Sequence, residues 1–188
     1  MRYNPDIHHR RSVRLKSYDY AQNGAYFVTI CVQDRRCLFG EIMNEGMTLN
    51  GAGKMIKSVL DEMPNHYDGI RLGKYTIMQN HIHLIIEIVG AGPRACPENR
   101  QSPECAGQPQ GVAPTRLSLN DIVHRIKTLT TKRYADGVKQ ENWSSFNKRL
   151  WQRNYYERII RDEAEYAHIA EYIINNPANW DKDDLREE

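Results

Sequence analysis

The chain has no apolar run long enough to span a membrane and no cysteine pair of the C-x-x-C type. A transmembrane helix needs about 20 consecutive apolar residues, so the sequence excludes a membrane-spanning protein. Its polar, basic N-terminus also lacks the apolar stretch of a signal peptide. Four widely spaced cysteines in 188 residues indicate reduced thiols rather than a disulfide framework. We therefore expect a cytoplasmic protein without a membrane partner.

The composition is that of an ordinary globular protein, with 40% hydrophobic and 27% charged residues. A chain of this length suits one domain, which we expect to extend over residues 1–188. Within it we distinguish a basic arm at 1–20 and an acidic tail at 181–188. Residues 90–115 are rich in proline and glycine and have too few apolar residues to fold alone, so we expect a flexible insertion there.

The small net charge of +2 conceals a strongly basic stretch. Residues 116–161 carry eleven Lys and Arg side chains against four acidic ones. Tryptophan, phenylalanine and tyrosine residues are interleaved with these charges. Such a stretch suits a polyanion whose bases can stack, although a solvated helix face explains the charge alone equally well.

Hydrophobic periodicity predicts an α+β protein with an antiparallel sheet backed by helices. The order resembles a ferredoxin-like split βαβ arrangement. Strands are expected at 25–32, 37–42, 46–49, 70–78, 81–89 and within 150–160, and helices at 52–63, 118–134 and 162–176. Pro64 and Pro177 are expected to lie beyond the ends of the first and last helices.

Two histidines flank one aliphatic residue at the start of the strand expected at 81–89. Because side chains alternate across a strand, His81 and His83 point to one face while Ile82 points into the core. Two neighbouring imidazoles on a rigid strand can bind one metal ion. A surface histidine pair without a ligand is nevertheless a common alternative.

A tyrosine and an asparagine lie one helical turn apart in the last predicted helix. Tyr172 and Asn176 would share a face there. Alone they would indicate packing and a helix stop. Together with the histidines, an amide oxygen can complete a divalent cation site that leaves room for a phosphate. A tyrosine hydroxyl beside the cation can act as a nucleophile, although its usual pKa of about 10 requires help from the metal or a base.

Several separated segments resemble the HUH single-tyrosine transposases, in particular the bacterial REP-associated tyrosine transposases. The resemblance covers nearly the whole chain apart from 90–115 and the acidic tail. The segments that carry it are Arg11–Tyr20, Tyr26–Ile30, Asn80–Ile86, Leu150–Ile160 and Glu171–Pro177.

The resemblance implies a ferredoxin-like or RRM-like nuclease fold and a DNA strand transferase. His81, His83 and Asn176 would bind Mg²⁺ or Mn²⁺, and Tyr172 would attack the scissile phosphate to give a 5′-phosphotyrosine. The implied substrate is hairpin-forming repeat DNA cut as a single strand, by a monomer or a homodimer associated with the nucleoid. The side chains that we expect to contact DNA are Arg14, Lys16, Lys127, Arg133, Trp151 and Arg153.

Some assignments within this site stay open at the level of sequence. Gln79 stands where the family often has proline. Pro177 disfavours helical geometry at Asn176, so Asn175 is an alternative third ligand. His168 is a candidate proton relay, although a packed or solvated histidine is the commoner case. The rival nucleophiles Tyr155 and Tyr156 suit DNA contact better.

Two functions of other classes compete with strand transfer. A domesticated, non-catalytic module could bind single-stranded nucleic acid through an antiparallel sheet with exposed aromatic rings. A structural zinc site could combine the histidines with Cys96 and Cys105, but these cysteines are nine positions apart, far from usual zinc spacing. No acidic cluster adjoins the histidines in sequence, which argues against a metal phosphohydrolase.

Overall fold

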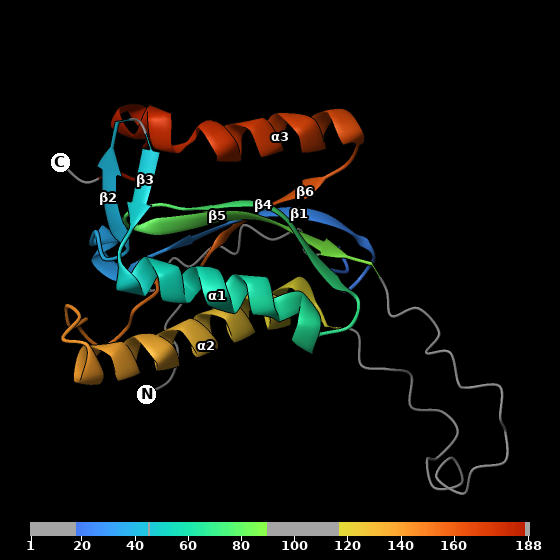
Figure 1. The fold of residues 1–188 in the computed structure, drawn as a ribbon. Coiled ribbons are helices and arrows are strands. Elements are labelled where there is room, and N and C mark those ends of the chain that lie inside the picture. The colour runs from blue at the N-terminus through green and yellow to red at the C-terminus, as the bar shows by residue number, and fades with distance from the viewer. Residues whose placement is uncertain (1–17, 45, 90–116, 187–188) are drawn as a thin grey trace, which may run out of the picture.

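A four-stranded antiparallel sheet organises the protein. The computed structural model describes residues 18–44, 46–89 and 117–186. The strands are ordered β4-β5-β1-β6, so β5 and β1 are central and β6 forms an edge. Helices α1 and α2 cover one face of the sheet and α3 covers the other (Figure 1). The bounds of the sheet strands are Gly24–Cys31 for β1, Ile70–Ile77 for β4, His81–Ile88 for β5 and Tyr156–Ile160 for β6. The predicted α+β class and antiparallel sheet are confirmed.

The remaining elements connect and cover this sheet. A separate hairpin is formed by β2 and β3, as predicted. The bounds are Gln33–Arg35 for the 3₁₀ helix η1, Gly40–Met43 for β2, Gly46–Leu49 for β3, Gly51–His66 for α1, Leu119–Gln140 for α2, Glu163–Asn175 for α3 and Pro177–Lys182 for the 3₁₀ helix η3. No helix in the described part of the chain is long and apolar enough to cross a membrane.

The alternation of side chains along the central strands divides the interior into two layers. Tyr26, Val28 and Ile30 of β1 are fully buried in the larger cluster, which α1 and α2 cover. On the opposite face, Ile85 of β5 belongs to a smaller cluster that includes Ile173 of α3. His81 and His83 share the face of Ile85, so both histidines lie on the α3 side of the sheet. The strand that carries them is buried on both faces.

Side chains at the helix starts satisfy backbone N–H groups that have no partner within the helix. Ser118 and Asp121 form a capping box at α2, as expected from their spacing. At α3, the Asp162 carboxylate accepts a hydrogen bond of 2.8 Å from the Glu165 N–H. The predicted start of the last helix is therefore confirmed at its cap.

Two predicted helix ends were wrong. Pro64 lies inside the last turn of α1, which continues to His66, and the Tyr67 N–H closes this turn on the Met63 carbonyl at 3.2 Å. The second helix continues six residues beyond Tyr134, to Gln140. Its extension is packed, because the ring of Trp143 lies against Gly137 and meets Tyr134 edge-to-face. A contact of this kind leaves no periodic signal in the sequence.

Gly137 provides a test of this packing. A Cβ at this position would lie 2.3 Å from Cε3 of Trp143. Replacing a helical glycine by alanine normally stabilises a helix by about 1 kcal/mol, whereas overpacking costs about 1–3 kcal/mol. We therefore expect Gly137→Ala to lower the free energy of urea-induced unfolding by about 1 kcal/mol.

The same substitution in a Trp143→Ala background isolates the cause. Without the indole ring, the helix-propensity gain should appear, and Gly137→Ala should stabilise that background by up to about 1 kcal/mol. Stabilisation of the otherwise unaltered protein by Gly137→Ala would contradict the packing explanation.

Candidate metal and tyrosine site

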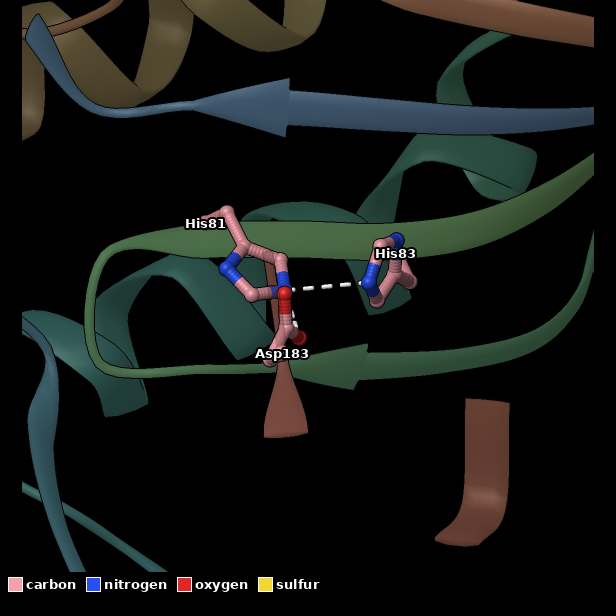
Figure 2. A group of neighbouring side chains, drawn as sticks. All are labelled: His81, His83 and Asp183. Carbon is pink, nitrogen blue, oxygen red and sulfur yellow. Dashed lines mark hydrogen bonds and ion pairs between the residues drawn. The ribbon is translucent and has the colours of Figure 1, made fainter. Parts of the chain in front are cut away.

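The two histidines of β5 meet on the α3 face of the sheet, as their spacing predicts. His81 and His83 are both buried, and their Nε2 atoms are 3.0 Å apart. Figure 2 shows the Nε2 atoms of the two rings directed toward each other beside Asp183. Buried imidazoles this close form a compact pair of potential metal ligands.

Hydrogen-bonding contacts at Nδ1 orient both imidazole rings. The Nδ1 of His83 lies 2.8 Å from the Thr29 hydroxyl on β1, the residue directly opposite in the sheet. The Nδ1 of His81 lies 2.8 Å from Oδ1 of Asn80. The amide nitrogen of Asn80 donates to the carbonyls of Arg35 and Leu185, which assigns its oxygen as the acceptor from His81. His81 therefore carries its proton on Nδ1 and presents a lone pair at Nε2.

Burial keeps both imidazoles neutral. It is the principal cause that lowers the pKa of His81 and of His83 to about 3. For His83 the neighbouring His81 lowers the pKa further. The neutral form is the form of histidine that coordinates a metal ion, so the site is prepared for a cation at neutral pH.

Tyr172 of α3 lies above the histidine pair. Its hydroxyl is 3.4 Å from Nε2 of His83, and its ring meets the rings of His83 and Phe27 edge-on. The side chain is still 46% exposed, so a ligand can reach the hydroxyl. Burial raises the pKa of Tyr172, the charges of Asp183 and Asp184 raise it further, and a hydrogen bond with Asn176 opposes them. Ionisation of this hydroxyl would need a nearby cation.

Asn176 is buried at the junction of α3 and η3. Its amide nitrogen donates to Oδ2 of Asp183 at 3.2 Å, and its Oδ1 has no hydrogen-bond partner. Pro177 was expected to disfavour helical geometry at Asn176, yet Asn176 keeps that geometry, with φ −58° and ψ −42°. The chain passes directly into η3, where Pro177 occupies a first position that needs no N–H donor. Asn175, the alternative ligand, is exposed.

Asp183 joins the site from the segment that the sequence indicated only as an acidic tail. Its Oδ2 lies 3.7 Å from Nε2 of His81, and its side chain is 5% exposed. The 3₁₀ helix η3 returns the chain to the site, and Trp180 within it stacks on His81 with ring centroids 6.0 Å apart. A sequence signal that could have indicated docking of this segment is the tryptophan at position 180, which the structure buries.

His81, His83 and Asp183 form a group that could hold a metal ion, since their ligand atoms lie within 4.8 Å of one another. The donor set fits a divalent cation on three counts. The two imidazoles are neutral. The Asn176 oxygen is buried without a hydrogen-bond partner. The Asp183 carboxylate lies at ion-pair distance from His81, but this histidine is neutral and supplies no positive charge. Buried charges and orphaned acceptors are costly unless a cation compensates them.

A pocket of about 890 Å³ adjoins this cluster. Its lining includes Phe27, His83 and Tyr156 from the sheet, His168 and Tyr172 from α3, and residues 182–185 from the C-terminal segment. His168, for which a packed or solvated side chain was the favoured interpretation, is exposed on α3 and lines the same pocket as the tyrosine. The volume is ample for a phosphate together with part of a larger ligand.

Comparison with known proteins identifies relatives of this chain. No protein-family model matches it. An uncharacterized protein of Haemophilus influenzae is 40% identical over 187 residues, which are 98% of this chain and 97% of the relative. A second H. influenzae protein, described as a candidate REP-associated tyrosine transposase, is 25% identical over 163 residues, 85% of this chain and 73% of its own. The chain is thus homologous to a candidate REP-associated tyrosine transposase.

A solved structure of a REP-associated tyrosine transposase bound to a REP hairpin has the same fold. It matches with a TM-score of 0.53 and 16% sequence identity, and covers 91% of this chain and 74% of the other. This likeness confirms the predicted fold, an α+β arrangement with an antiparallel sheet backed by helices, which the two proteins share.

Four of the predicted DNA contacts fall within the described residues, and none of these four lines the pocket at Tyr172. On α2, Lys127 donates to the carbonyls of Gln152 and Asn154 at 2.9 Å, and Arg133 pairs with Glu62. Trp151 is buried, with Nε1 donating to Thr130 at 2.8 Å, whereas Arg153 is exposed. Their roles in DNA binding stay predictions. Arg14, Lys16, Cys96 and Cys105 lie outside the described residues.

The orientation of His83 by Thr29 can be tested with two matched threonines. Thr29 and Thr76 both lie opposite His83, on β1 and β4, but it is the hydroxyl of Thr29 that lies 2.8 Å from the imidazole Nδ1. Loss of an orienting hydrogen bond typically weakens metal binding about 10–100-fold. We expect Thr29→Val to lower the affinity for Mn²⁺ by this factor in calorimetric titration, and Thr76→Val to leave it near that of the unaltered protein. Equal losses in both variants would contradict the role of Thr29.

Proposed function

We propose that the protein is a metal-dependent single-stranded DNA endonuclease and strand transferase. It would cut hairpin-forming repeat DNA through a 5′-phosphotyrosine intermediate. The observation that carries the proposal is the position of the Tyr172 hydroxyl, 3.4 Å from His83 Nε2 and beside a cluster suited to a cation. The similarity to a candidate REP-associated tyrosine transposase supports the same chemistry.

The metal would be held by His81, His83 and the Oδ1 of Asn176, with Asp183 as an anionic ligand. Carboxylate and amide oxygens suit Mg²⁺, while imidazoles favour transition metals, so Mn²⁺ would serve as well as Mg²⁺. When bound, the cation would polarise a phosphoryl oxygen and favour ionisation of a nearby hydroxyl. The orphaned oxygen of Asn176 supports its choice over the exposed Asn175.

Tyr172 would then carry out the bond exchange. Its hydroxyl would lose its proton to solvent, the oxygen would attack the phosphorus, and the bond from phosphorus to the 3′ oxygen would break. The departing 3′ oxygen would take up a proton from solvent to give a free hydroxyl. Because one phosphoester replaces another, the reverse reaction can rejoin a strand without ATP. The ring contacts with His83 and Phe27 would hold the nucleophile in position before the DNA arrives.

The geometry favours a tyrosine that acts within its own chain. Tyr172 reaches the His83 of the same molecule, because α3 packs on the sheet of its own chain (Figure 1). A monomer would therefore contain a complete site, although a homodimer is compatible with the fold. The relative solved with a REP hairpin supports a hairpin as the DNA partner.

Removal of the nucleophile tests the proposal directly. We expect Tyr172→Phe to bind labelled single-stranded repeat hairpins like the unaltered protein but to form no covalent protein–DNA product with Mn²⁺ or Mg²⁺. Denaturing electrophoresis measures this product. Tyr75→Phe is the control, because Tyr75 bonds to Asp61 on the other side of the sheet from α3, and it should retain the covalent band.

Two outcomes would contradict this assignment. A covalent band that persists in Tyr172→Phe would transfer the nucleophile to another residue. Hairpin binding without any covalent band, across several hairpins and with both metals, would favour the domesticated, non-catalytic module instead.

The anionic ligand has a matched control next to it. Asp183 lies in the cluster, whereas Asp184 is exposed and contacts Arg35 through its backbone carbonyl. Loss of a carboxylate ligand should cost more than loss of an orienting partner, which is worth about tenfold or more. We expect Asp183→Asn to weaken Mn²⁺ binding at least about tenfold in calorimetric titration, and Asp184→Asn, which removes only a nearby charge, to weaken it clearly less. Unchanged affinity in Asp183→Asn would remove Asp183 from the ligand set.

A further inference from the structure

Tyr156, Thr29 and His83 lie side by side across three neighbouring strands, although Tyr156 is far from His83 in sequence. It lies opposite Thr29 in the pairing of β6 with β1, and Thr29 lies opposite His83 in the pairing of β1 with β5. Residues directly opposite one another in a sheet project from the same face. With strands about 4.8 Å apart, Tyr156 is two strands, or about 10 Å, from His83 on the α3 side.

The ring of Tyr156 is exposed, and no other aromatic ring in the described part of the chain stacks on it. It is 61% exposed, the largest exposure among the large hydrophobic residues of the described segments. No ring of residues 18–44, 46–89 or 117–186 stacks on it, whereas the preceding Tyr155 packs against the core. Tyrosine is favoured in strands, but strand propensity does not require an uncovered ring beside a reactive site.

Tyr156 also lines the pocket that contains the Tyr172 hydroxyl. A volume of about 890 Å³ exceeds the need of a phosphate group alone. The ring therefore borders the space that the remainder of a nucleotide would fill. An exposed aromatic ring beside a phosphate-handling site has the chemistry to bind a nucleobase, because every base presents a flat face for stacking.

We propose that Tyr156 is the stacking platform for the nucleobase next to the scissile phosphate. This proposal rests on the proposed function for the position of that phosphate. The base would lie on Tyr156 at the edge strand while its phosphate lies between Tyr172 and the histidine cluster. Stacking would position the strand for attack and would be tolerant of base identity, since it uses the face of the base and no hydrogen bonds.

Fluorescence of 2-aminopurine tests the contact without requiring cleavage, because stacking on an aromatic ring quenches it. The probe is placed in turn at each single-stranded position of a REP hairpin, and binding is measured with the Tyr172→Phe protein. We expect quenching at a position next to the cut site and its loss in the further variant Tyr156→Val, which keeps a strand-favouring residue. Tyr156→Trp should retain the quenching, and Ile174→Ala, which removes an exposed side chain outside the pocket, should not affect it.

Affinity provides a second readout. Base–aromatic stacking corresponds to roughly 5- to 150-fold in binding, so Tyr156→Val should weaken hairpin binding within that range. An abasic nucleotide at the quenched position should weaken binding by the Tyr172→Phe protein by a similar factor. With this abasic DNA, adding Tyr156→Val should cause no further loss of affinity. Quenching that persists in Tyr156→Val, or a loss that is equally large with abasic DNA, would overturn the proposal.

The results separate this proposal from the proposed function. A Tyr172-dependent covalent product together with quenching that is independent of Tyr156 would reject the stacking platform alone. Quenching that requires Tyr156, without any covalent product, would reject the strand transfer and leave Tyr156 as a base-binding residue.

Discussion

The register between β1 and β5 is the constraint on which the rest of the site depends. Side chains on a strand alternate in direction, so a slip of one residue would turn His81 and His83 toward α1 and α2. The register is held by the apolar face of both strands, where Val28 lies opposite Leu84 and Ile30 opposite Ile82. The hydrophobic core on one face of the sheet therefore decides which chemistry appears on the other.

Buried polar groups need hydrogen-bond partners, and the side chain of Asn80 forms three such hydrogen bonds near the site. Its amide links the carbonyls of Arg35 after β1 and Leu185 near the C-terminus, while its oxygen orients His81. Arg35 donates in turn to the carbonyl of Asp184. One buried side chain thus connects three distant segments, and the position of Asp183 depends on the same contacts that orient the imidazole.

The tyrosine helix is placed by a close approach to the sheet. The Tyr166 hydroxyl donates to Glu87 at 2.8 Å, over Gly73 in a part of β4 where its pairing with β5 shifts register. A Cβ on Gly73 would lie 2.4 Å from that hydroxyl, so glycine leaves the space that α3 needs. With this end of α3 held on the sheet, Tyr172 two turns later reaches the histidines. Tyr156, on the open edge beyond, is left uncovered.

The local patterns of the sequence determined the strands, the common face of His81 and His83, the cap at Asp162 and the helix that carries Tyr172. These features follow from alternation, helical spacing and capping, which involve residues close together in the chain. Docking between distant segments decided the rest: the extension of α2 under Trp143, the helical Asn176 before Pro177, the approach of Asp183 and the row from His83 to Tyr156. No local pattern specifies such contacts, because they depend on where η3 and β6 lie once the sheet has formed.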